Sequence, residues 1–343
     1  MQPDNHIPTQ STRILAFDYM KAIAIILVVI GHYCPASSPK IWVAINKIIY
    51  SFHMPVFMAA SGFLYAYTRK PQRYSLFLIK KFKRLIVPYL SASVLIFGIK
   101  IFTERIVAIE NPVQIIDIVR ILWYPEAGYF LWFLMALWWC FVLIPLFRTK
   151  SSRLVLLIIA ASLSVLPWHA PEALCLCQTQ KMLVYFVLGV VIHDYSGLLK
   201  RLISVNIWLV LSLFLLAEII YVWEVPTLVY ILPYLGITAM LSLSFAIERT
   251  GRIPRLKHTL LFVSLYSFGI YLFHTTFEGF GKTAFAILYR HFDITWSVGP
   301  FAVAATVIIL TGVIFPILLY RCIFSRFVTT QLLFGASAPA KNK

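Results

Sequence analysis

Charged residues are scarce in this sequence, and acidic residues are the scarcest. Aspartate and glutamate together number 13 among 343 residues, and all charged residues make up 13% of the chain, whereas soluble domains carry roughly 25%. Water is therefore not the main solvent of this chain, and nothing in it suggests a soluble domain. Short segments of alternating apolar residues are also missing, which argues against a membrane β-barrel. Helices are the remaining way to satisfy the backbone within a bilayer.

Several signals of cofactor or metal chemistry are missing as well. The chain has no glycine-rich phosphate loop, no short repeat and only five cysteines. Cys175 and Cys177 are too close in the sequence to bridge each other readily, and a metal site needs more ligands than they supply. We therefore expect no metal and regard these cysteines as incidental.

Long, continuous apolar runs are what the sequence has in abundance, and they have helical length. The first run holds polar groups and is not followed by a small-residue cleavage site, so we expect a retained helix there. The predicted fold class is an all-α integral membrane protein, a bundle of about ten transmembrane helices. The predicted helices cover residues 14–34, 44–67, 85–103, 129–147, 153–168, 181–195, 206–223, 228–247, 259–277 and 297–320.

The net charge of +17 reports topology rather than nucleic-acid binding, because basic residues of membrane proteins gather in cytoplasmic segments. With the N-terminus inside, the basic stretches 69–84, 148–153 and 249–257 all face the cytoplasm. An even number of crossings returns the C-terminus to the same side. The sequence thus predicts a cytoplasmic N-terminal segment, a transmembrane domain and a cytoplasmic tail over residues 1–13, 14–327 and 328–343.

A smaller set of charged residues falls on the expected outer side. The basic ones, counting a lysine near a helix end, are Lys40, Lys47, Lys100, Arg105, Arg120, Lys181, Lys282 and Arg290, and the acids include Glu126, Glu172 and Glu278.

Polar residues inside the first helix are the first candidates for function, because a charge within a bilayer costs a few kcal/mol and is kept for a reason. Asp18 and Lys21 are helical neighbours that can pair. Lys21 and His32 project from one face, about 16 Å apart along the axis. Alternatively, Lys21 extends to the inner headgroups and His32 lies at the outer interface.

The second helix brings another histidine to a similar depth. His53 lies a short way in from the outer surface, close to Pro55, Ser61 and Gly62. Proline and glycine let neighbouring helices or ligands approach the backbone closely. Two histidines at matched depth beside such a helix indicate a site.

The segment from Lys80 to Arg84 is the most basic in the chain. It contributes to the positive-inside signal and attracts anionic headgroups. Equally, it offers a docking site for a phosphorylated, adenine-bearing cofactor.

These residues resemble the membrane-bound acyltransferase 3 family, which includes bacterial O-acetylases of cell-surface polysaccharides. The resemblance spans nearly the whole chain. In that family the first helix carries a basic residue, ten intervening positions and a histidine, matched by Lys21 and His32, and an Arg-x-x-Arg motif lies in the loop before the third helix, matched by Lys81-x-x-Arg84. Lysine replaces the more usual arginine at both first positions. The other matching stretches are 52–55 with 61–63, 131–134 and 266–274.

The resemblance implies an O-acyltransferase of the bacterial inner membrane. Its donor would be acetyl-CoA or a related acyl-CoA, with the phosphates bound by Lys81, Arg84 and Lys21. His32 would act as general base or acyl carrier, and His53 would orient the acceptor or share the proton. Further residues expected at the substrate are Ser61, Trp132, Tyr271 and His274.

The implied acceptor is a glycan or a lipid-linked sugar, and the expected surroundings are the lipid bilayer without nucleic acid. The sequence leaves the oligomeric state open. A polytopic transporter or exporter of a polysaccharide precursor is the main alternative, since transporters also keep ionisable residues and Pro/Gly-interrupted helices in the membrane. A non-catalytic subunit of a secretion machine is a third possibility, in which the histidines would be dispensable.

Overall fold

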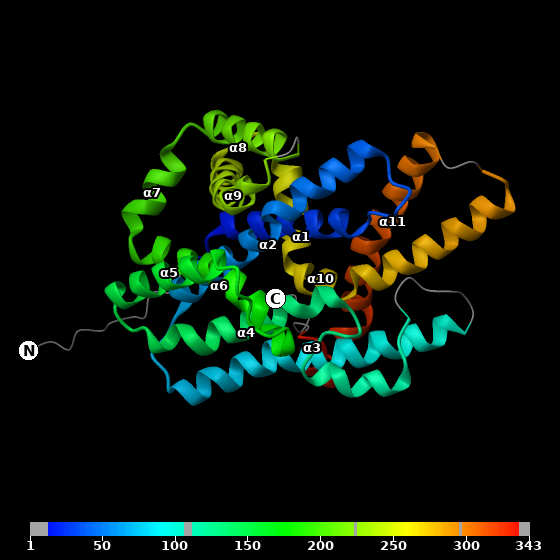
Figure 1. The fold of residues 1–343 in the computed structure, drawn as a ribbon, viewed down its shortest axis with the longest axis horizontal. Coiled ribbons are helices and arrows are strands. Elements are labelled where there is room, and N and C mark those ends of the chain that lie inside the picture. Colours follow the sequence, from blue (N-terminus) through cyan, green and yellow to red (C-terminus); the bar gives the residue numbers. More distant parts are fainter. Residues whose placement is uncertain (1–12, 106–111, 223–224, 295–296, 336–343) are drawn as a thin grey trace, which may run out of the picture.

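The computed structural model describes residues 13–105, 112–222, 225–294 and 297–335, and this part of the chain is helical without a β-strand (Figure 1). Most of the predicted N-terminal segment and the tail beyond residue 335 lie outside the described residues. The α-helices are α1 Leu15–His32, α2 Lys40–Thr68, α3 Tyr74–Glu104, α4 Trp132–Leu143, α5 Lys150–Val165, α6 Leu176–Asp194, α7 Ser196–Ser204, α8 Ile207–Val222, α9 Leu232–Arg249, α10 Pro254–His291, α11 Val298–Leu319 and α12 Val328–Phe334. Shorter helical turns are η1 Ile115–Leu122, η2 Tyr129–Leu131, η3 Ile144–Leu146, η4 Ala173–Cys175, η5 Pro226–Tyr230 and η6 Tyr320–Phe324.

The chain is an all-α membrane protein. Seven of the described helical segments are long and apolar enough to cross a bilayer, and α7 with α8, bent by 84°, makes an eighth if the pair is counted as one span. The seven are Leu15–His32, Lys40–Thr68, Tyr74–Glu104, Tyr129–Leu146, Ala173–Asp194, Pro254–His291 and Val298–Phe324.

Each helix predicted from the sequence coincides with a helix of the structure, but two of the predicted boundaries were wrong. Helix α3 begins at Tyr74 rather than near residue 85, so Lys81 and Arg84 lie within a helix and not in a loop. Lysine and arginine are good helix formers, and their charge marks the membrane surface without ending the helix. Helix α10 likewise extends to His291 rather than residue 277, which places Glu278 on a helix.

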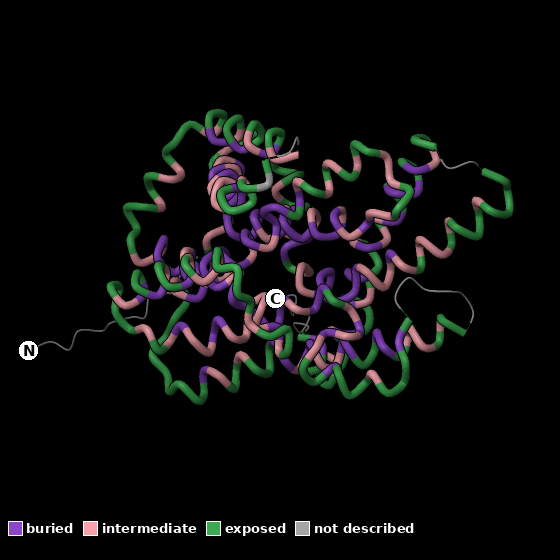
Figure 2. Tube along the Cα trace, viewed as in Figure 1, coloured by how far each residue is buried: buried purple, intermediate pink, exposed green. Residues whose placement is uncertain are grey.

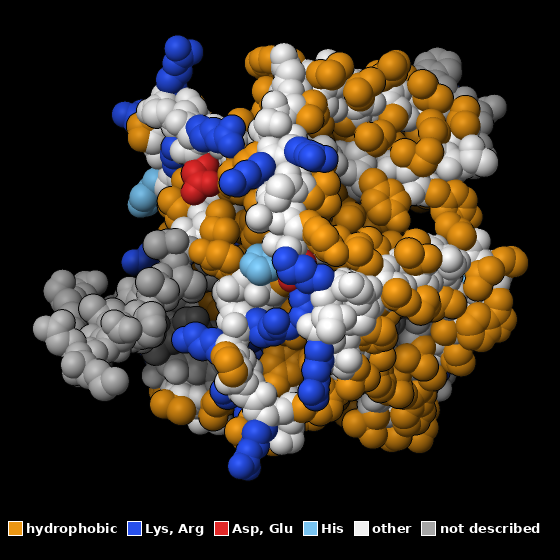
Figure 3. Space-filling view, turned by 90° about the vertical axis from the view of Figure 1, so that its left-hand side faces the viewer, with side chains coloured by type: hydrophobic (Ala, Val, Ile, Leu, Met, Phe, Trp, Pro, Cys, Tyr) orange, Lys and Arg blue, Asp and Glu red, His pale blue; other side chains and the backbone are white. Residues whose placement is uncertain are grey.

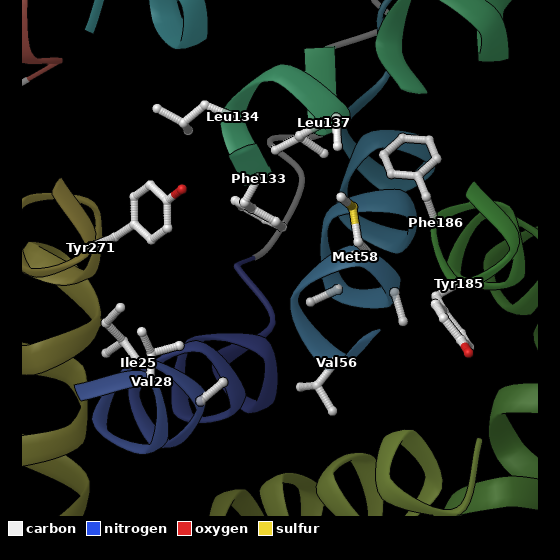
Figure 4. Packing of buried hydrophobic residues seen from close by; sticks show 14 of the residues in the cluster. Ile25, Val28, Val56, Met58, Phe133, Leu134, Leu137, Tyr185, Phe186 and Tyr271 are labelled. Atoms are coloured by element: carbon white, nitrogen blue, oxygen red, sulfur yellow. The ribbon is translucent and has the colours of Figure 1, made fainter. Parts of the chain in front are cut away.

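Helices α1, α2 and α6 form the middle of the bundle, where buried residues concentrate, while α7 and α8 lie on its rim (Figure 2). Side chains from α1, α2, α4, α6 and α10 meet there in one apolar core (Figure 4). Glycines allow α2 and α6 to come very close. A Cβ atom at Gly62 would lie 1.9 Å from the carbonyl oxygen of Phe186, and one at Gly189 would lie 2.0 Å from that of Ala59. This is the small-residue packing by which membrane helices approach one another.

Helix α12 belongs to the packed structure, although its residues fall in the segment predicted as a tail. Phe334 is buried and its ring stacks on Phe324 with centroids 4.2 Å apart. The hydroxyl of Tyr320 donates a hydrogen bond of 2.5 Å to the carbonyl of Phe334. The described beginning of the predicted tail is therefore part of the core.

Candidate functional site

The end of α1 is held firmly, and this fixes the position of His32. Helix α1 stops at His32 because Pro35 follows shortly after and disfavours helix before it. Two carbonyls at this end accept side-chain hydrogen bonds from the start of α2: Asn46 donates to Gly31, and the indole of Trp42 donates to Tyr33 over 2.6 Å. The carbonyls that a helix end leaves unpaired are thereby satisfied.

His32 lies beside His274, although the two are far apart in the sequence. Helix α10 packs along α1 and brings their rings to a centroid distance of 4.9 Å. The ring of Phe130 contacts both, with centroids 6.0 Å from His32 and 5.1 Å from His274. Phe130 is itself held in place, because the hydroxyl of Tyr271 donates a 2.6 Å hydrogen bond to its carbonyl.

The hydrogen bonds of His274 fix which of its ring nitrogens carries a proton. Its Nδ1 atom lies 3.0 Å from the carbonyl oxygen of Ile270 and 2.9 Å from that of Tyr271. A carbonyl oxygen can only accept, so Nδ1 is the donor and Nε2 of the neutral ring has a free lone pair. Nε2 is buried and has no hydrogen-bond partner among the described residues. His274 is therefore equipped to accept a proton next to His32.

Tyr50 connects His32 with His53. Its hydroxyl lies 3.5 Å from Nδ1 of His32, and its ring centroid lies 5.0 Å from that of His53. Nδ1 of His53 donates a 2.7 Å hydrogen bond to the carbonyl of Ile49, which leaves Nε2 as an acceptor in the neutral ring. Together, His274, His32, Tyr50 and His53 form a row of rings from α10 through α1 to α2, which we call the histidine row.

A cavity of about 1800 Å³ opens in front of this row. Its wall includes His32 and His53 together with Trp132 and Tyr271 of the predicted substrate residues. The other two predicted substrate residues do not line it: His274 is fully buried behind His32, and Ser61 is half-buried elsewhere on α2. The cavity wall includes the last part of α1, the first half of α2 and the second half of α10, together with residues of α3, α5, α6 and the segment 124–132.

Glu278 is a cavity residue that sequence reasoning missed. It is only 1% exposed, and its Oε1 atom has no hydrogen-bond partner among the described residues. A carboxyl group is costly to bury in this way. Glu278 follows His274 by one helical turn, and that spacing was the available signal. It was overlooked because the helix was predicted to end at residue 277.

A second buried acid braces the cavity wall from behind. Glu218 of α8 is fully buried, and the hydroxyl of Ser51, which lines the cavity, donates a hydrogen bond to it. Glu218 lies within the predicted helix 206–223, and its contact with Ser51 ties α8 to α2.

The residues predicted to bind the donor lie away from the histidine row. Lys21 pairs with Asp18 at 2.8 Å, as the sequence predicted, and Arg13 pairs with the same carboxylate at 2.5 Å. That hydrogen bond raises the pKa of Arg13, which lies outside the membrane-spanning segments. The ammonium group of Lys81 lies 3.7 Å from the ring centroid of Phe141, a cation–π contact.

Neither Lys21, Lys81 nor the exposed Arg84 lines the cavity. The structure thus brings together the predicted catalytic histidines and separates them from the predicted donor site. Along α1 the separation between Lys21 and His32 is about 16 Å.

The sequence model of the acyltransferase 3 family, described as an acyltransferase domain, matches residues 14–321. The chain is 44% identical over 59 residues to nodulation protein NolL of Sinorhizobium fredii, a match that covers 16% of each protein. It is 30% identical over 165 residues to nodulation protein NolL of Mesorhizobium japonicum, which covers 44% of this chain and 40% of that protein. The chain thus matches less than half the length of either relative. No solved structure matches it.

Proposed function

Because this chain belongs to the acyltransferase 3 family, we propose that it is an O-acyltransferase that moves an acetyl or similar short acyl group from acyl-CoA to a sugar hydroxyl. The observation that carries the proposal is the pairing of His32 and His274 at the wall of a cavity large enough for a sugar. A hydroxyl is a weak nucleophile at neutral pH and needs a base within hydrogen-bond reach. His32 is the histidine of this pair that faces the cavity.

The proposed reaction depends on the transfer of one proton to and from His32. His32 takes the proton of the acceptor hydroxyl as its oxygen attacks the thioester carbonyl, and a tetrahedral intermediate forms. The carbon–sulfur bond then breaks, and the proton returns from His32 to the departing CoA thiolate. His274, whose Nε2 is a free acceptor, stabilises the charged state of His32. In the alternative course, His32 carries the acyl group before the hydroxyl attacks.

The donor would bind at the opposite end of the bundle. Lys81, Arg84 and Lys21 would hold the phosphates of acyl-CoA, and its flexible arm would reach along α1 toward His32. Lysine and arginine side chains gather on the face shown in Figure 3, which supports a cytoplasmic orientation of that end. The proposed topology has ten crossings of the bacterial inner membrane with both termini inside.

The acceptor would enter from the outer side as a glycan or a lipid-linked saccharide. Trp132 and Tyr271 line the cavity and offer aromatic surfaces on which a sugar ring can pack. His53 would orient the acceptor through its free Nε2 atom.

The proposal is tested by following the label of radiolabelled acetyl-CoA. The purified protein in detergent is given this donor with candidate lipid-linked saccharides, and the products are separated by chromatography. Labelled saccharide is the expected result. If no donor is consumed while a saccharide crosses the membrane of proteoliposomes, the protein is a transporter. If neither occurs and a secretion complex still requires the protein, it is a non-catalytic subunit.

Loss of the basic pair on α3 should weaken donor binding without slowing the chemistry. The double variant Lys81→Ala/Arg84→Ala is expected to raise the KM for acetyl-CoA by about tenfold, because charge-assisted contacts to phosphate are lost. The kcat should stay near that of the wild type. The matched control is Lys200→Ala/Arg201→Ala on the rim helix α7, whose side chains are exposed and lie outside the cavity. An unchanged donor KM in the α3 variant would remove the donor site from this helix.

His274 should matter through its proton affinity rather than its bulk. His274→Phe keeps an aromatic ring in the buried space but removes the acceptor nitrogen. We expect kcat to fall by about tenfold, less than the loss of a general base itself, with little change in either KM. His258→Phe, at an exposed position on the same helix, is the control. A fall in thermal stability that parallels the fall in kcat would indicate a packing role only.

A further inference from the structure

The cavity in front of the histidine row is rich in basic residues. Its wall includes Lys47 of α2, Lys100 of α3, Lys181 of α6, and Lys282 and Arg290 of α10. Four separate helices therefore direct positive charge at one space. None of these residues belongs to the motifs on which the proposed donor site rests.

This concentration is unusual for the side of the membrane where it occurs. The proposed topology places these residues on the outer side, where lysine and arginine are normally sparse. Even so, most of the basic residues predicted for that side line this one cavity. Basic residues that lie on the side where they are normally sparse indicate that the cavity needs positive charge.

The wall also holds three acidic residues, Glu126, Glu172 and Glu278, so five basic residues face three acids. Glu126 interacts electrostatically with Lys100, and Glu278 with Lys282. An excess of positive charge remains by count. A concave site with an excess of charge of one sign focuses its field and concentrates ligands of the opposite sign.

Two further details fit a ligand that enters from the membrane surface. Lys47 is positioned rather than loose, since its ammonium donates a 3.2 Å hydrogen bond to the carbonyl of Tyr221 and lies 4.4 Å from that ring's centroid. Exposed apolar side chains, among them Val165 and Ile287, share the cavity wall with the basic residues. The cavity thus has basic residues that can bind an anion and apolar residues that can contact a lipid chain.

We propose that the cavity in front of the histidine row selects an acceptor that carries an oxyanion, either the phosphate of a lipid carrier or the carboxylate of an acidic sugar. This inference rests on the proposed function, because it takes the molecule bound in the cavity to be the acceptor. Lysine and arginine recognise both groups through charge-assisted hydrogen bonds. An anion bound near Lys47 and Lys181 would keep the attached sugar, with its hydroxyls, in the same cavity as His32.

The test compares three probes that differ in charge: octyl β-glucoside, octyl β-glucuronide and octyl phosphoglucose. Binding is measured by tryptophan fluorescence with the protein in phosphatidylcholine nanodiscs, and empty nanodiscs serve as the reference. The wild type should bind at least one charged probe about tenfold more tightly than the neutral one, and added salt should weaken this preference.

The variant Lys47→Gln/Lys181→Gln/Arg290→Gln should lose about tenfold in affinity for the charged probe, since exposed charges contribute modestly but add together. Its affinity for octyl β-glucoside should not change. The matched control is Lys200→Gln/Arg201→Gln/Arg326→Gln, which removes the same charge from exposed positions outside the cavity. This control should bind all three probes as the wild type does.

The outcomes separate the sources of the anion and the possible failures. A preference for octyl phosphoglucose alone assigns the anion to a lipid carrier, and a preference for octyl β-glucuronide alone assigns it to the sugar. Equal binding of neutral and charged probes overturns the inference, as does a cavity variant that loses acetyl-CoA binding instead of probe binding. Because binding needs no acyl transfer, failure of the proposed function would show only in the labelling assay.

Discussion

Replacement of His32 by alanine should lower the kcat of acyl transfer by about 10³-fold, within the range expected for loss of a general base. The effect should be this large because His32 is the member of the His32–His274 pair that lines the cavity. Its Nδ1 atom lies 3.5 Å from the hydroxyl of Tyr50. The KM for acetyl-CoA should change little, since the proposed donor contacts, on α1 and α3, lie at the opposite end of the bundle. The measurement is a time course of labelled saccharide under saturating donor.

His53→Ala and His258→Ala are the companions of this variant. His53 lines the same cavity and should show a smaller loss, mainly in the KM for the acceptor, whereas the exposed His258 should show none. Thermal unfolding of all three variants establishes that they are folded. Labelled product at the wild-type rate from the His32 variant would remove His32 from the chemistry.

Alanine at Gly62 should cause the largest loss of stability among the single changes considered. The new methyl group would lie 1.9 Å from the backbone oxygen of Phe186, which cannot move away as a flexible side chain could. Helices α2 and α6 would have to separate, and we expect a cost of about 3 kcal/mol, at the upper end for overpacking. Gly189→Ala should behave in the same way, because it meets the carbonyl of Ala59 across the same contact.

Gly98→Ala is the matched control for these variants. Gly98 lies within α3, and among the described residues no atom beyond its chain neighbours and its own helix backbone lies within 4 Å of an added Cβ. Alanine should therefore stabilise this helix slightly, by up to about 1 kcal/mol. The midpoint of thermal unfolding in detergent measures both effects. A Gly62 variant that unfolds at the wild-type temperature would show that the two helices are not in close contact.

Much of the helical framework could be predicted from the sequence, because a bilayer forces apolar runs into helices. The errors arose where charge was taken to mark a loop. The residues from Lys80 to Arg84 continue α3, and Glu278 to Arg290 continue α10. Charged side chains can leave the hydrocarbon region while their backbone stays helical, so helix ends near the membrane surface cannot be placed from polarity alone.

The candidate site was predictable only in part. His32 and His53 stand out because polar groups are rare in their helices, and both line the cavity. His274 was expected only as a residue at the substrate, yet it lies beside His32. Its position depends on how α10 packs against α1, a contact between distant segments that no local pattern encodes.

The separation between Lys21 and His32 along α1 has a consequence for the direction of the reaction. In the proposed orientation, free CoA is released toward the cytoplasm, whereas the acylated sugar is left on the outer side. The two products are then released into different compartments, and only this protein brings them together again. Reverse transfer would therefore need the same protein, and the supply of acetyl-CoA inside the cell would set its direction.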